Sequence, residues 1–93
     1  MLIRIITERK NVRWVCGLMG EFFPSFTVYK ATGFWMGKRE KSLVIEIDLF
    51  DNSDHLFDAN IKMIVKKICG FNRQQSVLVQ KIESKSELLG GNC

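Results

Sequence analysis

The residues best suited to bind a small anion lie in two stretches of the chain. One follows the apolar residues 34–36 and is rich in charge; the other, at residues 72–75, combines an arginine with amide side chains. Arginine can contact a phosphate through two parallel N–H donors, and amides carry both a donor and an acceptor for a base edge. With two flat aromatic side chains, these stretches predict a site for a nucleotide-like anion. The candidate ligand-binding residues are Tyr29, Trp35, Lys38, Arg39, Glu40, Arg73 and Gln75.

Three bulky apolar residues, Phe34, Trp35 and Met36, lie between Gly33 and Gly37. A plain hairpin does not need such residues near its tip, so we expect a neighbouring subunit to cover them as part of an oligomer interface. Interface cores are rich in aromatic residues even where no ligand binds. Two interpretations therefore stay open: the cleft beside the hairpin holds a ligand, or side chains alone fill it.

One histidine and several aspartates raise the question of a metal site. Asp51, Asp54 and Asp58 lie near His55, and the last two aspartates are one helical turn apart. Zinc sites need several His or Cys ligands, and calcium loops follow a longer regular pattern. The group is better explained as the acid-rich start of a helix that Ser53 caps. We therefore predict neither a metal nor a cofactor.

The three cysteines, Cys16, Cys69 and Cys93, form neither a disulfide framework nor a catalytic set. Their number is odd and their spacing is not paired, and no base lies near Cys16 or Cys69 in the sequence. We therefore expect a protein that binds rather than catalyses, in a reducing cytoplasm. The opening apolar run is short and is interrupted by Arg4, unlike a signal peptide. No run is long enough to span a bilayer, so no membrane partner is predicted.

Hydrophobic periodicity divides the chain into six elements. Apolar residues alternate along residues 43–49, as in a strand, and recur at helical spacing in two longer stretches. Pro24 ends the first helix, and Gly70 followed by Phe71 is typical of the end of the second. The predicted elements are a strand at 1–7, a helix at 8–23, strands at 25–37 and 41–50, a helix at 53–69 and a strand at 75–83.

The order strand, helix, strand, strand, helix, strand predicts an α+β fold of the ferredoxin-like, split β-α-β type. Its four-stranded antiparallel sheet is expected in the order 4-1-3-2, with both helices on one face. In this interpretation residues 1–84 form one domain and residues 85–93 form a C-terminal tail. A domain of this size buries only a modest core.

The second face of the sheet is also expected to be covered. Both sets of alternating residues in the first strand are apolar, with Ile3 and Ile5 on one side and Leu2 and Ile6 on the other. Apolar residues make up 46% of the chain, and large exposed apolar patches mark interaction sites. We expect self-association to bury this face; the alternative is the C-terminal tail, whose residues 88–89 are leucines.

An aromatic-rich strand with Tyr29, a Trp35-x-Gly37-Lys38 turn and Glu40 leading into an apolar strand follow one another in this chain. This stretch, within the element order given above, resembles the PII-like and CutA-like small trimeric proteins. The resemblance implies a homotrimer with clefts between its subunits. It does not carry over metal or nucleotide ligands residue by residue, because the chain lacks the His-Pro-Tyr-Glu stretch of CutA-like proteins and the PII phosphate-binding loop.

Two other classes of function stay open. A small, basic, one-domain chain could be an inhibitor that blocks a larger protein, of the kind that phages and other mobile elements carry. The net charge of +4 favours anionic partners, and several basic residues could contact the phosphates of a nucleic acid. The expected central strands lack the stacking aromatics of RNA-binding ferredoxin-like sheets, so a solvated charged face is the simpler explanation. These basic residues are Arg9, Lys10, Arg13, Lys38, Arg39 and Lys41.

Overall fold

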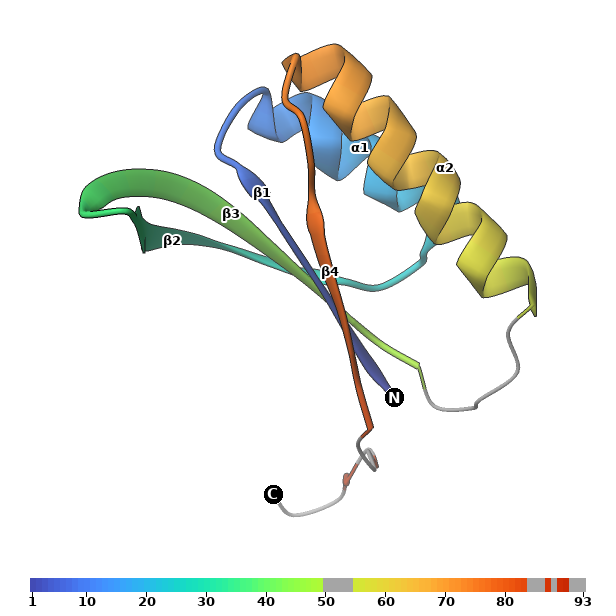
Figure 1. Ribbon diagram of the computed structural model, residues 1–93. Coiled ribbons are helices and arrows are strands. Elements are labelled where there is room, and N and C mark those ends of the chain that lie inside the picture. The colour runs from blue at the N-terminus through green and yellow to red at the C-terminus, as the bar shows by residue number, and fades with distance from the viewer. Residues whose placement is uncertain (50–54, 84–86, 88, 91–93) are drawn as a thin grey trace.

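A computed structural model of the chain describes residues 1–49, 55–83, 87, 89 and 90, and the side chains of residues 55–58 lie outside this description. The predicted cap at Ser53 and much of the predicted C-terminal tail therefore lie outside the described residues. Figure 1 shows the elements in chain order. They are β1 (Leu2–Glu8), α1 (Val12–Phe22), β2 (Thr27–Trp35), β3 (Lys38–Asp48), α2 (His55–Asn72) and β4 (Leu78–Ile82). Neither helix, over its described residues, is long and apolar enough to cross a membrane.

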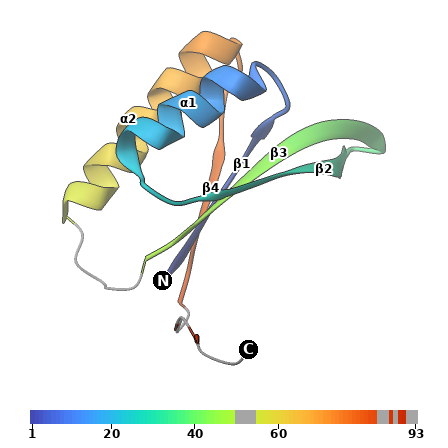
Figure 2. The same ribbon diagram turned by 180° about the vertical axis from the view of Figure 1, so that it is seen from behind.

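The four strands form one antiparallel sheet in the order β2-β3-β1-β4. Read from the β4 edge, the same order runs 4-1-3-2. Both helices lie on one face of this sheet (Figures 1 and 2). The predicted α+β class, with a four-stranded antiparallel sheet and two helices, is confirmed, and the arrangement is compatible with a ferredoxin-like fold.

The core lies between the helices and one face of the sheet. Ile3 pairs with Ile47 and Ile5 pairs with Ile45 across the two central strands, so alternation turns all four side chains toward the helices. They are almost completely buried there, as the alternation in residues 43–49 predicts. The helices contribute the buried residues Val15, Leu18, Met19, Ile61, Ile64 and Ile68.

The helix boundaries differ from those predicted. Because Glu8 still pairs with Ser42 in the sheet, β1 continues through it and α1 begins only at Val12. Helix α2 continues past Gly70, which is not its terminal glycine, and ends at Asn72. Arg73 takes the left-handed conformation with φ 56°, and the next N–H donates to the Cys69 carbonyl at 3.1 Å, as in a Schellman motif.

Stacked aromatic rings join the two helices. The rings of Trp14 in α1 and Phe71 in α2 lie with their centroids 3.9 Å apart and their planes inclined by 7°. Aromatic pairs of this kind stabilise a contact beyond the area they bury. Phe71 therefore lies within the last turn of α2 and holds it against α1. The sequence had suggested instead that Phe71 follows the end of the helix.

The hairpin of β2 and β3 extends beyond the rest of the sheet and projects from the body of the molecule (Figure 1). The last pair between β3 and β1 is Ser42 with Glu8, whereas β2 and β3 stay paired to Trp35 and Lys38. Two residues close the tip, Met36 and Gly37, with φ values of 50° and 79°. Positive φ at both positions is typical of a type I′ turn, where asparagine followed by glycine is preferred. Methionine is therefore strained at the first position.

Arg9 fastens the projecting hairpin to the body of the protein. Its Nη2 donates to the Ala31 carbonyl at 2.7 Å and its Nε to the Ser42 carbonyl at 3.2 Å. Its backbone N–H donates to the Lys41 carbonyl at 3.1 Å. Arg9 thus contacts both strands of the hairpin at the point where β1 ends and no longer supports them.

Replacing Arg9 with alanine is expected to destabilise the chain by about 2 kcal/mol, because hydrogen bonds made by a charged group are stronger than average. Urea unfolding measures this loss, and hydrogen exchange should show faster opening in residues 31–42. Lys10→Ala is the matched control, since its ion pair with Glu8 at 3.3 Å is half-exposed and such pairs contribute at most about 1 kcal/mol. Equal stability losses for both variants would contradict the proposed role of Arg9.

Candidate ligand-binding site

A pocket of about 650 Å³ lies where the projecting hairpin, the end of β1 and the loop between α2 and β4 meet. The hairpin forms one wall and the loop forms the opposite wall, with the last residues of β1 between them. The residues lining it are Ile6, Thr7, Glu8, Trp35, Glu40, Lys41, Ser42, Arg73, Gln74, Gln75, Ser76 and Leu78. We call this space the hairpin pocket.

The hairpin pocket brings together four of the seven candidate ligand-binding residues. Trp35 and Glu40 come from the hairpin, and Arg73 and Gln75 come from the loop after α2. The two pairs are more than thirty positions apart in the sequence. The two pairs meet because the antiparallel sheet places the β2–β3 hairpin near the start of β4, with the end of β1 between them.

The other three candidates lie outside the lining of the pocket. Arg39 pairs with Phe34 in the hairpin, so alternation turns it to the opposite face from Glu40. Lys38 pairs with Trp35 at the tip itself. Tyr29 lies farther along β2, where its hydroxyl donates to Glu46 Oε2 at 3.2 Å.

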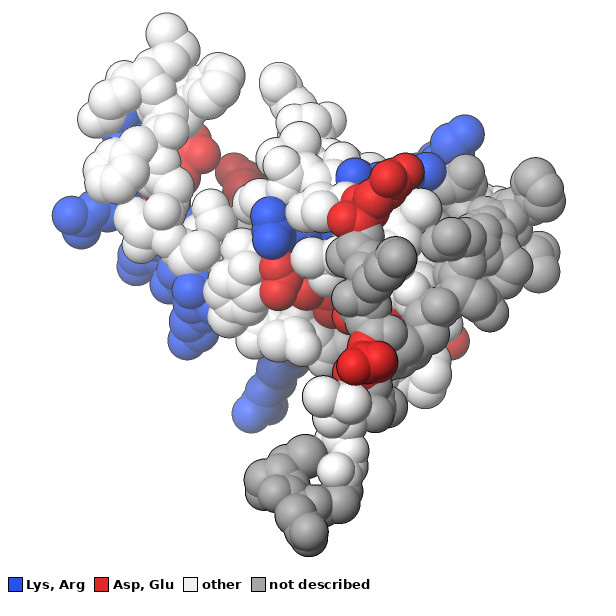
Figure 3. Space-filling model, turned by 90° about the horizontal axis from the view of Figure 1, so that it is seen from below, with Lys and Arg blue, Asp and Glu red and all other residues white. Residues whose placement is uncertain are grey.

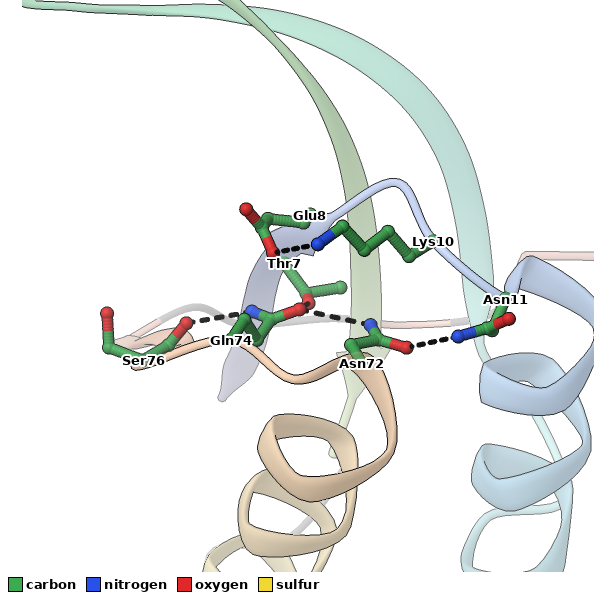
Figure 4. Close-up of polar contacts among 7 residues, drawn as sticks. All are labelled: Thr7, Glu8, Lys10, Asn11, Asn72, Gln74 and Ser76. Atoms are coloured by element: carbon green, nitrogen blue, oxygen red, sulfur yellow. Dashed lines mark hydrogen bonds and ion pairs between the residues drawn. The ribbon is translucent and has the colours of Figure 1, made fainter.

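The loop wall of the pocket is held by a network of amide side chains (Figure 4). Asn11 Nδ2 donates to Asn72 Oδ1 at 2.9 Å, and Asn72 Nδ2 donates to Gln74 Oε1 at 3.0 Å. Thr7 Oγ1 donates to the same Gln74 oxygen at 3.0 Å, and Gln74 Nε2 donates to the Ser76 carbonyl at 2.8 Å. Because these bonds occupy Asn72 and Gln74, the two amides position the loop, and the exposed Gln75 is the amide left facing solvent.

Arg73 occupies a backbone conformation that its side chain does not favour. Its φ of 56° lies in the left-handed region, where the residue after a helix is usually glycine. In the described chain, the non-glycine residues with positive φ are Asn11, Met36 and Arg73. Asparagine tolerates this conformation better than methionine or arginine does. Strained residues cluster at binding sites because the surrounding structure holds them in place. Met36 and Arg73 lie on the two segments that form the pocket walls.

The lining of the pocket carries both signs of charge. Lys41 and Arg73 are its cations, and Glu8 and Glu40 are its carboxylates. Glu8 forms an ion pair with Lys10 at 3.3 Å, which offsets one of the negative charges. A ligand with an anionic group would therefore meet Arg73 on the loop wall, and Glu40 would accept hydrogen bonds from its hydroxyl groups.

A polar row crosses the open face of the sheet. Arg4 Nε donates to Glu46 Oε2 at 2.9 Å, and Arg4 Nη1 donates to Gln80 Oε1 at 3.5 Å. Tyr29 donates to the same carboxylate, so the row joins all four strands. The hydrogen bond to Glu46 raises the pKa of Arg4 above its ordinary value, and Arg4 therefore remains cationic at all ordinary pH values. Apolar residues flank the row on this face, namely Leu2, Ile6, Val44, Leu78 and Ile82.

The candidate metal group at His55 lies outside the described residues, because the side chains of residues 55–58 are not described. In the parts of the chain that the structure does describe, no group of three or more His, Cys, Asp or Glu side chains is placed to hold a metal ion. Cys16 and Cys69 are half-buried free thiols on the two helices.

Comparisons with known proteins indicate the fold and no activity. No protein-family model matches the chain, and no curated protein matches it. Several solved structures are similar, and one of them is the de novo designed protein Foldit4. It is 16% identical, with a TM-score of 0.50, over 90% of this chain and 94% of that chain. At this identity the likeness concerns the arrangement of strands and helices alone.

Proposed function

We propose that the protein is a non-catalytic homotrimer that binds a small, nucleotide-like anion in the hairpin pocket, at the junction between subunits. The observation that carries this proposal is the composition of the pocket walls. Trp35 offers a flat ring, Arg73 offers a cation with paired donors, and Gln75 offers an exposed amide. These are the groups that recognise a base, a phosphate and a base edge.

The exposed hairpin tip supports the oligomeric part of the proposal. In the single chain Phe34, Trp35 and Met36 are 71%, 65% and 85% exposed, and consecutive apolar side chains of this kind mark interaction surfaces. Figure 3 shows white side chains at the end of the projecting hairpin, at the left of the view. Trp35 belongs both to the tip and to the pocket, so a subunit that covers the tip would also close the pocket. The resemblance to PII-like and CutA-like proteins supports a trimer.

Thermal unfolding with a panel of nucleotides tests the ligand. A nucleotide present at about 100 times its Kd should stabilise the protein by about 2.7 kcal/mol, which for a domain of this size raises the melting temperature by about 10 °C or more. Inorganic phosphate at the same concentration is the control, since it lacks the base that Trp35 would contact. Nucleotide binding would be contradicted if phosphate raised the melting temperature and the nucleotides did not, or if no nucleotide changed the melting temperature.

The same hairpin tip favours a second candidate function, an interaction protein that inserts its apolar tip into a larger target. This candidate predicts a monomer that shows no shift with nucleotides. Binding to nucleic acid has less support, because Arg9 bonds to the hairpin backbone and Lys10 pairs with Glu8. Figure 3 shows Lys and Arg side chains along the lower left of the face in view and at its upper right, with acidic side chains among them nearer the middle.

A further inference from the structure

A second hollow lies on another part of the molecule, between α2 and β4, and shares no residue with the hairpin pocket. Its volume is about 530 Å³. Ile61, Val65 and Val79 form an apolar floor, and the remaining lining residues are three lysines. The lysines are Lys62, Lys66 and Lys81. Among the side chains that the structure describes, no acidic one belongs to this lining, so the described groove combines apolar surface with positive charge.

The groove runs beside the edge of the sheet. In the register of the sheet Val79 pairs with Ile5, whose side chain faces the helices, so Val79 faces α2 as well. On α2, residues 61 and 65 are one turn apart, as are Lys62 and Lys66, and each pair forms a row along the helix. Figure 1 shows α2 in front of α1 and β4 in front of β1, so the groove lies on the β4 side of the molecule.

Strand β4 is an edge strand, since among the described strands it pairs only with β1. An edge strand presents backbone donors and acceptors to which an extended peptide can add as a further strand. In such a strand every second side chain would face α2. These side chains would lie on the apolar floor and within reach of Lys62 and Lys66.

We propose that β4 and this groove bind an extended peptide segment of a partner protein that carries apolar and acidic residues at alternate positions of one face. Charge complementarity favours acidic residues in the peptide, because Lys62 and Lys66 form a cationic row along the groove and no carboxylate belongs to its described lining. The position of β4 at the edge of the sheet favours a peptide over a lipid-like anion, because a lipid could not form backbone hydrogen bonds with a strand. This inference is independent of the proposed nucleotide site.

The probe for this proposal is the labelled peptide VSESVSE, which places valine and glutamate on one side of an extended chain. Fluorescence polarisation should detect its binding, and NMR should place the shifted amides in β4 and α2. The variant Lys62→Glu/Lys66→Glu should weaken binding about tenfold, which corresponds to about 1.4 kcal/mol. Lys67→Glu is the matched control, because it is exposed on the same helix and does not line the groove. Circular dichroism establishes that both variants fold.

Three further arms separate the possible occupants. The peptide VSKSVSK, and VSESVSE methylated at the amides that would face β4, should both bind at least tenfold more weakly than VSESVSE. The proposal is overturned if VSESVSE does not bind, if the methylated peptide binds equally well, or if Lys67→Glu weakens binding as much as the double variant. Displacement of the peptide by dodecanoate at comparable affinity would assign the groove to a lipid-like anion. Shifts in β4 that grow with protein concentration alone would assign it to a second copy of the chain, and either result overturns the proposal.

Discussion

Replacing Arg73 with glycine is expected to raise the melting temperature by about 5 °C and, at the same time, to weaken binding of a nucleotide-like anion by about 100-fold. The gain in stability follows from the left-handed conformation of Arg73. Glycine adopts this conformation without the steric cost of about 1 kcal/mol that other residues carry. The loss of binding follows from the removal of the cation on the loop wall of the hairpin pocket.

Two further variants make this test specific. Arg73→Lys keeps the charge and the strain but loses the paired donors, so its binding should be intermediate and its stability unchanged. Arg39→Ala removes the same charge from the hairpin outside the pocket lining, and it should weaken binding by less than about threefold, as expected for an exposed charge. Melting temperatures and isothermal titration give the two readouts. If Arg39→Ala weakens binding as much as Arg73→Gly, net charge and not the pocket governs affinity.

The double variant Phe34→Ser/Met36→Asn is expected to convert the protein from an oligomer to a monomer. Burying a phenylalanine and a methionine contributes about 3 kcal/mol or more, so their loss should raise the dissociation constant more than about 100-fold. Asparagine also suits the positive φ at position 36, so the hairpin itself should become more stable. Trp35 is left in place because it also lines the hairpin pocket.

Sedimentation equilibrium measures the dissociation constant of each form. Met63→Ser is the matched control, since it removes a half-exposed apolar residue from α2, away from the hairpin. It should leave the oligomer intact. An unchanged oligomer in the double variant would show that the tip does not form the interface. A monomeric wild-type protein would instead favour an interaction protein whose tip enters another target.

The strands could be predicted from local pattern, whereas the end of α2 could not. Alternation of apolar residues from Leu43 to Ile47 fixes which side of β3 faces the core, and this pattern lies within one short segment. Gly70 followed by an apolar residue is an ordinary helix end, yet the helix continues to Asn72. The last residue of the helix, Asn72, accepts a hydrogen bond from Asn11, which lies 61 positions away. No local pattern contains that information.

The site could be predicted by residue type and only partly by position. With the turn at Met36 and Gly37, antiparallel pairing places Trp35 opposite Lys38 and Phe34 opposite Arg39. A correct prediction of this turn would have placed residues 38–40 in β3, where alternation turns Arg39 and Glu40 to opposite faces of the hairpin. The approach of Arg73 to the hairpin depends instead on how α2 packs and where it ends, which requires the whole fold. The strain at Arg73 is likewise visible only in the structure.

Native mass spectrometry of freshly purified protein tests the central claim most directly, because it reports the number of subunits and any bound small molecule together. We predict a species of three 10.8 kDa chains that carries a small anion, and loss of that anion in Arg73→Gly with the trimer retained. A single 10.8 kDa chain without bound ligand would contradict the proposal that this protein is an oligomer that binds a ligand in the hairpin pocket.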